Sequence, residues 1–112
     1  MKTNQKSLKS LCVRTPEGFD FLRYSRIIRI KADGDVTYVY ARKHEKPVKA
    51  LQPFNVIECR LNQNFFKCHR SHIVNMKYVR NYCPKLNMLN TKAGAVPLSD
   101  SFVQEFKERY CR

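Results

Sequence analysis

The chain has 112 residues, of which 43% are hydrophobic, so it can form one domain with a buried core of its own. Twenty-two Lys and Arg against nine Asp and Glu give a net charge of +13, which indicates a polyanionic partner. The apolar runs are far shorter than the roughly 20 residues of a membrane span, and residues 1–15 lack the apolar segment of a signal peptide. We therefore expect a soluble, cytoplasmic protein without membrane association.

Basic residues dominate the second half of the chain. No Asp or Glu occurs between Arg60 and Ser99, although seven Lys or Arg stand from Arg60 to Lys92. A stretch of this length without acids favours a continuous positive field that can neutralise phosphates. The five cysteines form no Cys-x-x-Cys pair, and their odd number argues against a disulfide framework.

The first half of the chain reads as short strands. Segments rich in β-branched and aromatic residues alternate with turn signals, and they lie at residues 10–14, 19–22, 26–31, 36–42 and 48–50. Asp33 and Gly34 stand in a polar loop at residues 32–35. Asp-Gly between strands is typical of a hairpin, because Gly accepts the positive φ that such turns require.

Residues 51–61 change to a helical period. Leu51, Phe54, Ile57 and Leu61 recur on one face, and Pro53 belongs in the first turn. After a polar break at residues 62–64, we expect strands at residues 65–70, 73–79, 81–89 and 95–98. The connections between them are expected at residues 71–72 and 90–94.

A second helix is predicted at the end of the chain. Its apolar side chains recur at helical spacing at Phe102, Val103, Phe106 and Tyr110. Ser99 or Ser101 can cap its first turn, and Gln104 can complete a capping box with Ser101. The predicted architecture is therefore mostly β with two flanking helices, in one domain at residues 10–112 that follows an N-terminal extension at residues 1–9.

The segment FFKCHRSHIVN, residues 65–75, gathers the reactive side chains. Cys68 and His69 are neighbours on a predicted strand, where successive side chains point to opposite faces, so they cannot pair as nucleophile and base. His69 and His72 lack a helical spacing and a second cluster that would complete four metal ligands. Three glycines leave no Gly-rich phosphate loop. We therefore expect no enzymatic activity, no bound metal and no cofactor.

The same segment resembles the signature of LytTR DNA-binding domains, which runs approximately F-x-R/K-x-H-R-S-x-I/L-V-N. Three further segments resemble the family in the same order: residues 28–34 (IRIKADG), the helical segment at residues 51–61, and residues 96–99 (VPLS) before the last helix. The resemblance covers about residues 10–112.

This resemblance implies about ten short strands in stacked antiparallel sheets with flanking helices. It also implies sequence-specific DNA binding that regulates transcription, as in the response regulators of bacterial two-component systems. Loops then enter the major groove of double-stranded DNA at promoter repeats, where a homodimer can form. The implied DNA-binding residues are Asp35, Thr37, Lys67, His69, Arg70, Ser71, Ser99, Asp100 and Ser101.

The chemistry of these residues is compatible with that role. Arg70 can contact a guanine edge with two hydrogen bonds, whereas Lys67, Ser71 and Ser101 can hold phosphates. Asn75 is better suited to stabilise a turn or buried backbone than to contact DNA.

Two positions depart from the family pattern. Lys31 stands where the family usually has an acid, and Asp100 stands where it often has Arg. A carboxylate cannot donate to guanine, although it can accept from cytosine or favour the start of a helix. These departures leave a second hypothesis open, in which the fold is a protein-interaction or regulatory module that has lost specific DNA readout.

Overall fold

Ten short strands and two α-helices make up residues 9–112, the part of the chain that the computed structural model describes. The strands are β1 (Ser10–Thr15), β2 (Gly18–Arg23), β3 (Ile27–Asp33), β4 (Val36–Ala41), β5 (Val48–Ala50), β6 (Phe65–His69), β7 (His72–Asn75), β8 (Val79–Cys83), β9 (Met88–Thr91) and β10 (Gly94–Pro97). The helices are α1 (Phe54–Glu58) and α2 (Asp100–Tyr110), and the 3₁₀ turns are η2 (Tyr24–Arg26) and η3 (Met76–Tyr78). The predicted fold class is confirmed. Residues 1–8 of the expected N-terminal extension lie outside the described residues.

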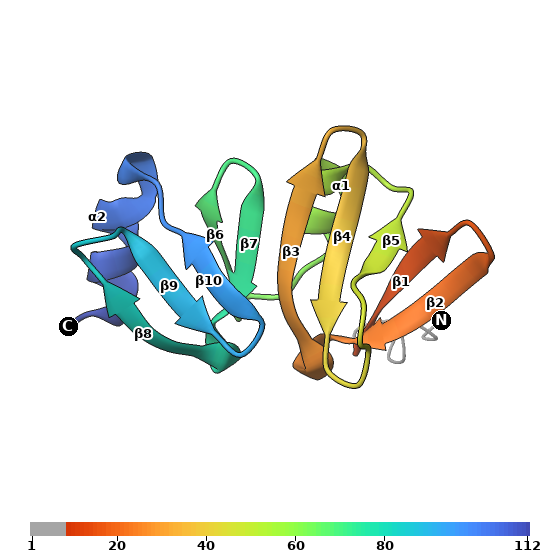
Figure 1. The fold of residues 1–112 in the computed structure, drawn as a ribbon, viewed down its shortest axis with the longest axis horizontal. Helices are drawn as coiled ribbons and strands as arrows, with labels where there is room; N and C mark the ends of the chain where they lie inside the picture. The colour runs from red at the N-terminus through yellow and green to blue at the C-terminus, as the bar shows by residue number, and fades with distance from the viewer. Residues whose placement is uncertain (1–8) are drawn as a thin grey trace, which may run out of the picture.

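The strands form three antiparallel sheets (Figure 1). The central sheet has five strands in the order β5-β4-β3-β7-β6, and the β1-β2 hairpin and the sheet β10-β9-β8 lie on either side of it. Helix α1 lies behind β3 and β4, whereas α2 lies beside the three-stranded sheet (Figure 1). Neither helix within residues 9–112 is long and apolar enough to cross a membrane.

Two separate cores lie on opposite faces of the central sheet. Because side chains alternate along a strand, Phe65 joins the core under α1 and the β1-β2 hairpin, whereas Phe66 joins the core under α2. Ile73 and Val74 on β7 divide in the same way. Strands β6 and β7 therefore connect the two halves of the molecule through both of their faces.

Aromatic packing fixes α2 against β6. The ring centroid of Phe66 lies 5.6 Å from those of Phe106 and Tyr110 and 6.4 Å from that of Phe102. These distances are within the range of favourable aromatic pairs. The apolar face predicted for the last helix therefore determines where this helix docks.

The first predicted helix is shorter than expected, because it covers only five of residues 51–61. The Leu51 N–H donates to the Arg14 carbonyl at 2.8 Å, which keeps Leu51 in an extended segment beside β1. Pro53 is the N-cap residue and is extended, with φ −61° and ψ 153°. At the other end, the Arg60 N–H donates to the Ile57 carbonyl and the Leu61 N–H donates to the Glu58 carbonyl. The helix therefore ends in hydrogen bonds that span three residues, as in a 3₁₀ turn.

The boundaries predicted at residues 73–98 are wrong in three places. The Asn75 side chain accepts a bond from the Lys77 N–H, so residues 76–78 form η3 rather than more strand. Residues 81–89 do not form one strand, because Pro84 to Asn87 make a turn with Asn87 at φ 52°. The expected turn at residues 90–94 shrinks to Lys92 and Ala93.

Helix α2 begins two residues earlier than a Ser101 cap requires. Ser99 is the N-cap residue, and its side chain makes no capping hydrogen bond. The predicted capping box of Ser101 and Gln104 is wrong, since Gln104 Nε2 donates to Glu108 Oε2 at 3.2 Å. The Ser99 and Ser101 hydroxyls lie 3.2 Å apart and bond to each other instead.

Candidate nucleic-acid interface

Three segments that are distant in sequence meet at one edge of the molecule. They are the β3-β4 turn, the β6-β7 turn and the start of α2, all at the upper edge in Figure 1. The Ala32 N–H donates to the Ser71 carbonyl at 2.9 Å, and the Ser99 N–H donates to the Cys68 carbonyl at 2.8 Å. The β6-β7 turn is therefore bonded to both of its neighbours. We call this edge, formed by residues 33–36, 69–72 and 99–101, the loop edge.

The β6-β7 turn presents Arg70 to solvent. Its two turn residues are Arg70 and Ser71, one residue earlier than predicted, because His72 pairs with His69 as the first residue of β7. His69 Nδ1 accepts a hydrogen bond from the Ser71 N–H at 3.0 Å. The His69 ring therefore braces the turn that carries Arg70, and among residues 9–112 the Arg70 guanidinium has no ion-pair partner.

The imidazole of His72 lies behind this turn. Its ring centroid is 5.2 Å from that of His69. Burial, together with the charges of His69, Arg29 and Lys31, lowers the pKa of His72 to about 4. His72 is therefore neutral at pH 7, and its buried Nδ1 has no hydrogen-bond partner among residues 9–112.

The neighbouring thiol is unsuited to nucleophilic chemistry. Cys68 is fully buried, and burial raises its pKa to about 12. Its Sγ donates to the His72 carbonyl at 3.7 Å. A nucleophilic cysteine needs a thiolate, so Cys68 acts as a core residue. No group of three or more His, Cys, Asp or Glu side chains within residues 9–112 is placed to hold a metal ion.

The β3-β4 turn contributes acidic side chains to the loop edge. Gly34 and Asp35 are its two turn residues, and Gly34 has φ 63°, the left-handed conformation that Gly adopts without strain. Asp33 and Asp35 are both exposed, as is Asp100 at the start of α2. The loop edge itself therefore combines one guanidinium with three carboxylates.

Seven of the nine predicted site residues belong to this edge, and two lie elsewhere. The seven are Asp35, His69, Arg70, Ser71, Ser99, Asp100 and Ser101. Thr37 is only 1% exposed, and its hydroxyl donates to the Gln52 carbonyl at 3.0 Å. Lys67 lies on the α1 side of the sheet, where its Nζ is 3.4 Å from Glu58 Oε1. Neither side chain is free to meet a ligand at the loop edge.

A row of four polar side chains that the sequence reasoning missed, two of them lysines, runs across the sheet next to the loop edge. Lys49 pairs with Tyr38, Tyr38 pairs with Lys31, and Lys31 pairs with His72 across four neighbouring strands. Residues directly opposite each other in a sheet share a face, so these four side chains form one row. The alternation of basic and apolar residues in IRIKA and VKA was the signal for it.

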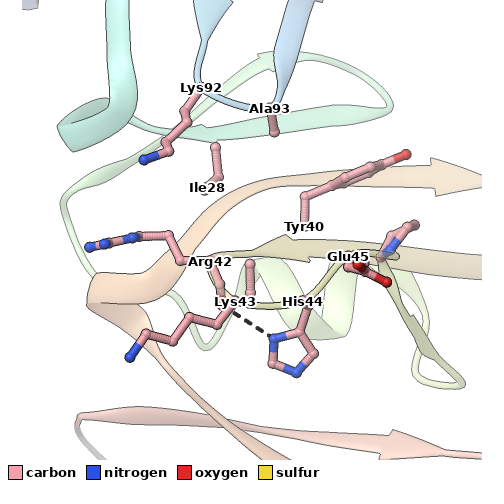
Figure 2. Close-up of a pocket in the computed structure, with 10 residues that line it drawn as sticks. Ile28, Tyr40, Arg42, Lys43, His44, Glu45, Lys92 and Ala93 are labelled. Atoms are coloured by element: carbon pink, nitrogen blue, oxygen red, sulfur yellow. Dashed lines mark hydrogen bonds between the residues drawn. The ribbon is translucent and has the colours of Figure 1, made fainter.

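A second basic surface lies away from the loop edge. A pocket of about 500 Å³ opens between the β4-β5 loop and the β9-β10 turn. Figure 2 shows the charged ends of Arg42, Lys43 and Lys92 on the same side of this pocket. None of the predicted site residues lines it.

Comparison with known families matches residues 18–110 to the LytTr DNA-binding domain. The chain belongs to the LytTR family of DNA-binding domains. A solved LytTr DNA-binding domain from Bacillus cereus, of a protein described as a methyl-accepting/DNA response regulator, is similar to it in structure. The TM-score is 0.75 at 25% sequence identity, and the match covers 89% of this chain and 94% of the other. No curated protein matches the chain.

The LytTR assignment agrees with the geometry described above. DNA binding is the property of the family, and a domain of this family is confirmed over most of the chain. The residues predicted for DNA contact at this edge lie on the β3-β4 turn, on and beside the β6-β7 turn, and at the start of α2.

Proposed function

We propose that this LytTR domain binds duplex DNA sequence-specifically through the loop edge and thereby regulates transcription in the cytoplasm of a bacterium, as part of a two-component system. The observation that carries the proposal is the bonded arrangement of three loops around Arg70. Neighbouring strands lie about 4.8 Å apart, so a two-residue hairpin turn fits into the roughly 12 Å major groove.

Arg70 is the proposed base-reading residue. Its guanidinium is exposed and without an ion-pair partner in the described chain, so its donors are available for a guanine edge. His69 acts through Arg70, because its bond to the Ser71 N–H orders the turn before DNA arrives. A turn that is already ordered loses less conformational entropy on binding.

Phosphate contacts are proposed for two features beside Arg70. Lys31 and Lys49 provide two ammonium groups in the row next to the loop edge. The first turn of α2 provides backbone N–H groups without a side-chain cap, together with the Ser99 and Ser101 hydroxyls. A helix start of this kind favours anions. These contacts would position the domain without reading sequence.

The three carboxylates of the loop edge set a condition on the docking geometry. A carboxylate near a phosphate is repelled, whereas one that faces a cytosine N4 accepts a hydrogen bond. Asp35 and Asp100 lie in the two segments that flank the β6-β7 turn, so each of them weakens binding if its segment docks against a phosphate strand and accepts from cytosine if its segment enters the groove.

Selection from a random duplex pool, followed by a salt titration, tests this proposal. We expect one enriched site, and an affinity for this site and for random duplex that falls steeply as salt rises, because bound phosphates release counterions. Arg42→Ala is the matched control for Arg70→Ala, because Arg42 lies in the β4-β5 loop at the opposite end of β4 from the loop edge. It removes the same charge, so it should leave the preference for the enriched site unchanged.

Failure of this experiment has a defined meaning. If no site is enriched and binding to random duplex is weak and insensitive to salt, the domain does not read DNA. The protein-interaction or regulatory alternative then applies. Paired half-sites in the enriched sequence would support binding as a homodimer on DNA.

A further inference from the structure

The β1-β2 hairpin exposes two aromatic side chains on an edge strand. Phe19 and Phe21 on β2 are 65% and 70% exposed. They are two residues apart, so they lie on the same face of the hairpin. Within residues 9–112, β2 pairs only with β1, and the hairpin stands at the right-hand end of the molecule in Figure 1. An exposed apolar edge strand of this kind is a surface for pairing with another strand.

The backbone of β2 has donors and acceptors that point outward along this edge. The Arg14 carbonyl accepts from the Leu51 N–H at 2.8 Å, and the Cys12 carbonyl accepts from Gln52 Nε2 at 3.0 Å. These β1 groups therefore point away from β2. Arg14 pairs with Phe19 and Cys12 with Phe21, so both are pairs without mutual hydrogen bonds. The N–H and C=O groups of Phe19 and Phe21 face the open edge.

The same reasoning extends to Arg23 at the end of β2. The Tyr24 N–H donates to the Lys9 carbonyl at 3.0 Å, so Tyr24 faces β1. Because backbone groups alternate in direction along a strand, Arg23 faces outward like Phe19 and Phe21. Three alternate residues of β2 therefore offer backbone hydrogen bonds at the open edge.

We propose that this edge binds a second copy of the chain by antiparallel pairing of the two β2 strands, with Phe21 opposite Phe21 of the second copy. In this two-fold register Phe19 of each copy lies opposite Arg23 of the other. It is the register in which all three outward-facing residues pair among themselves. The inference stands independently of the proposed function, because the hairpin is separate from the loop edge (Figure 1).

Side-chain complementarity supports a second copy as the occupant. Opposite residues share a face, so the Arg23 guanidinium of one copy would lie over the Phe19 ring of the other. The two Phe21 rings would form a cross-strand aromatic pair. The edge is thus complementary to itself in aromatic pairing, in the contact of Arg23 with Phe19 and in backbone bonding.

Sedimentation velocity of the full chain over a range of concentrations tests the pairing. The measurement is made at about 0.3 M salt, where the Debye length is short enough to screen repulsion between two chains of like net charge. We expect a concentration-dependent dimer. Phe19→Lys places a lysine opposite Arg23 twice in each dimer, and we expect the dissociation constant to rise about tenfold or more.

Two further variants separate the register from a general surface effect. Phe19→Lys combined with Arg23→Glu restores opposite charges at both pairs, so the double variant should regain most of the dimer. Leu86→Lys, which changes a side chain that is 71% exposed elsewhere, should leave the dissociation constant unchanged. Thermal unfolding of each variant confirms that the hairpin change has not unfolded the domain.

Four outcomes would overturn the inference. They are a chain that stays monomeric at all concentrations, a dimer that tolerates Phe19→Lys, a double variant that remains monomeric, and a dimer seen only after removal of residues 1–8. The last outcome would mean that this segment covers the edge in the full chain. DNA affinity measured below the dimer dissociation constant should be the same in Phe19→Lys and Leu86→Lys, which add the same charge, and this comparison keeps failure of this inference distinct from failure of DNA binding.

Discussion

The Asn75 side chain donates to the Ile27 carbonyl at 2.8 Å across 48 residues of sequence. Its Nδ2 also lies 3.3 Å from the Tyr24 carbonyl, and its Oδ1 accepts from the Lys77 N–H at 3.0 Å. Asn75 is 2% exposed, and its bond to the Ile27 carbonyl is buried, whereas the other two bonds are partly buried. One side chain therefore joins the start of β3 to the end of β7, where the central sheet changes direction into η2 and η3.

We expect Asn75→Ala to lower the free energy of unfolding by about 2–3 kcal/mol, because it leaves buried backbone groups without partners. Urea denaturation measures this change. Asn75→Asp keeps the acceptor and loses the two donors, so it should also destabilise the fold. Asn81→Ala removes an exposed bond to Asn90 and should stay within about 0.5 kcal/mol of wild type. An Asn75→Ala variant as stable as Asn81→Ala would show that the Asn75 bonds contribute little.

The role of Asn75 was predictable from its residue type. Most of the strands and helices were predictable as well, from the sequence pattern. The strands of the first half and the strand and helix classes of the second follow from hydrophobic periodicity, which the two cores require. The turn at Gly34 follows from the demand for a positive φ.

Two of the errors depend on partners that are distant in sequence, whereas η3 and the turn at residues 84–87 arise from local hydrogen bonds. Leu51 leaves the expected helix to bond with Arg14, and Thr37 turns inward to bond with Gln52. Local propensity cannot reveal either contact. The row of Lys31 and Lys49 could not be recognised without the register of four strands, although the alternation in each strand was visible.

The protonation of His72 predicts a dependence of stability on pH. The folded-state pKa of about 4 lies below the ordinary 6.5, so the unfolded chain binds more protons between these values. The contribution of neutral His72 to the free energy of unfolding is fully present above about pH 6.5 and is lost as the pH falls toward 4. The urea midpoint should therefore decrease over this range, and His72→Gln should flatten the curve. His44→Gln changes an exposed histidine and should keep the wild-type slope.

If the urea midpoint depends on pH equally in wild type and in His72→Gln, the lowered pKa of His72 is not the cause of the pH dependence. The charged groups around His72 are His69, Arg29 and Lys31, all of which disfavour its protonation. Neutralising Lys31 should therefore reduce the pH dependence partially, whereas neutralising Arg42 at the far end of β4 should not.

Arg70 is expected to carry specificity rather than general affinity. Arg70→Ala should weaken binding to the selected site by about 1–3 kcal/mol and have a smaller effect on random duplex, if the guanidinium makes a two-bond guanine contact. Arg70→Lys should lose most of the discrimination, because an ammonium cannot make the paired bonds. Equal losses on both DNAs would show that Arg70 contacts a phosphate.

Lys31 and Lys49 are expected to contribute general affinity for DNA rather than the specificity expected of Arg70. Each substitution by Ala should weaken binding to the selected site and to random duplex by similar factors. Each should also reduce the slope of log affinity against log salt by about one, since one fewer phosphate is neutralised. Arg42→Ala supplies the comparison. If Lys31→Ala or Lys49→Ala changes base preference and leaves the salt slope intact, that side chain reads bases.

Asp100 distinguishes docking geometries at the start of α2. If this segment approaches the phosphates, the exposed carboxylate opposes them, and the penalty falls with added salt as the Debye length shortens. Asp100→Asn should then tighten binding at low salt, and the gain should shrink as salt rises. The free energy of unfolding should change by less than about 1 kcal/mol, because an acid in the first turn of a helix contributes only this much.

Glu45→Gln is the matched control for Asp100→Asn, because it removes one exposed negative charge in the β4-β5 loop. A gain in affinity shared by both variants reflects net charge alone. A gain confined to Asp100→Asn places the start of α2 beside the DNA. A loss of affinity at one cytosine-containing position would mean that Asp100 accepts from a base. If neither affinity nor salt slope changes, the start of α2 lies away from the DNA, and the docking rests on the two hairpin turns.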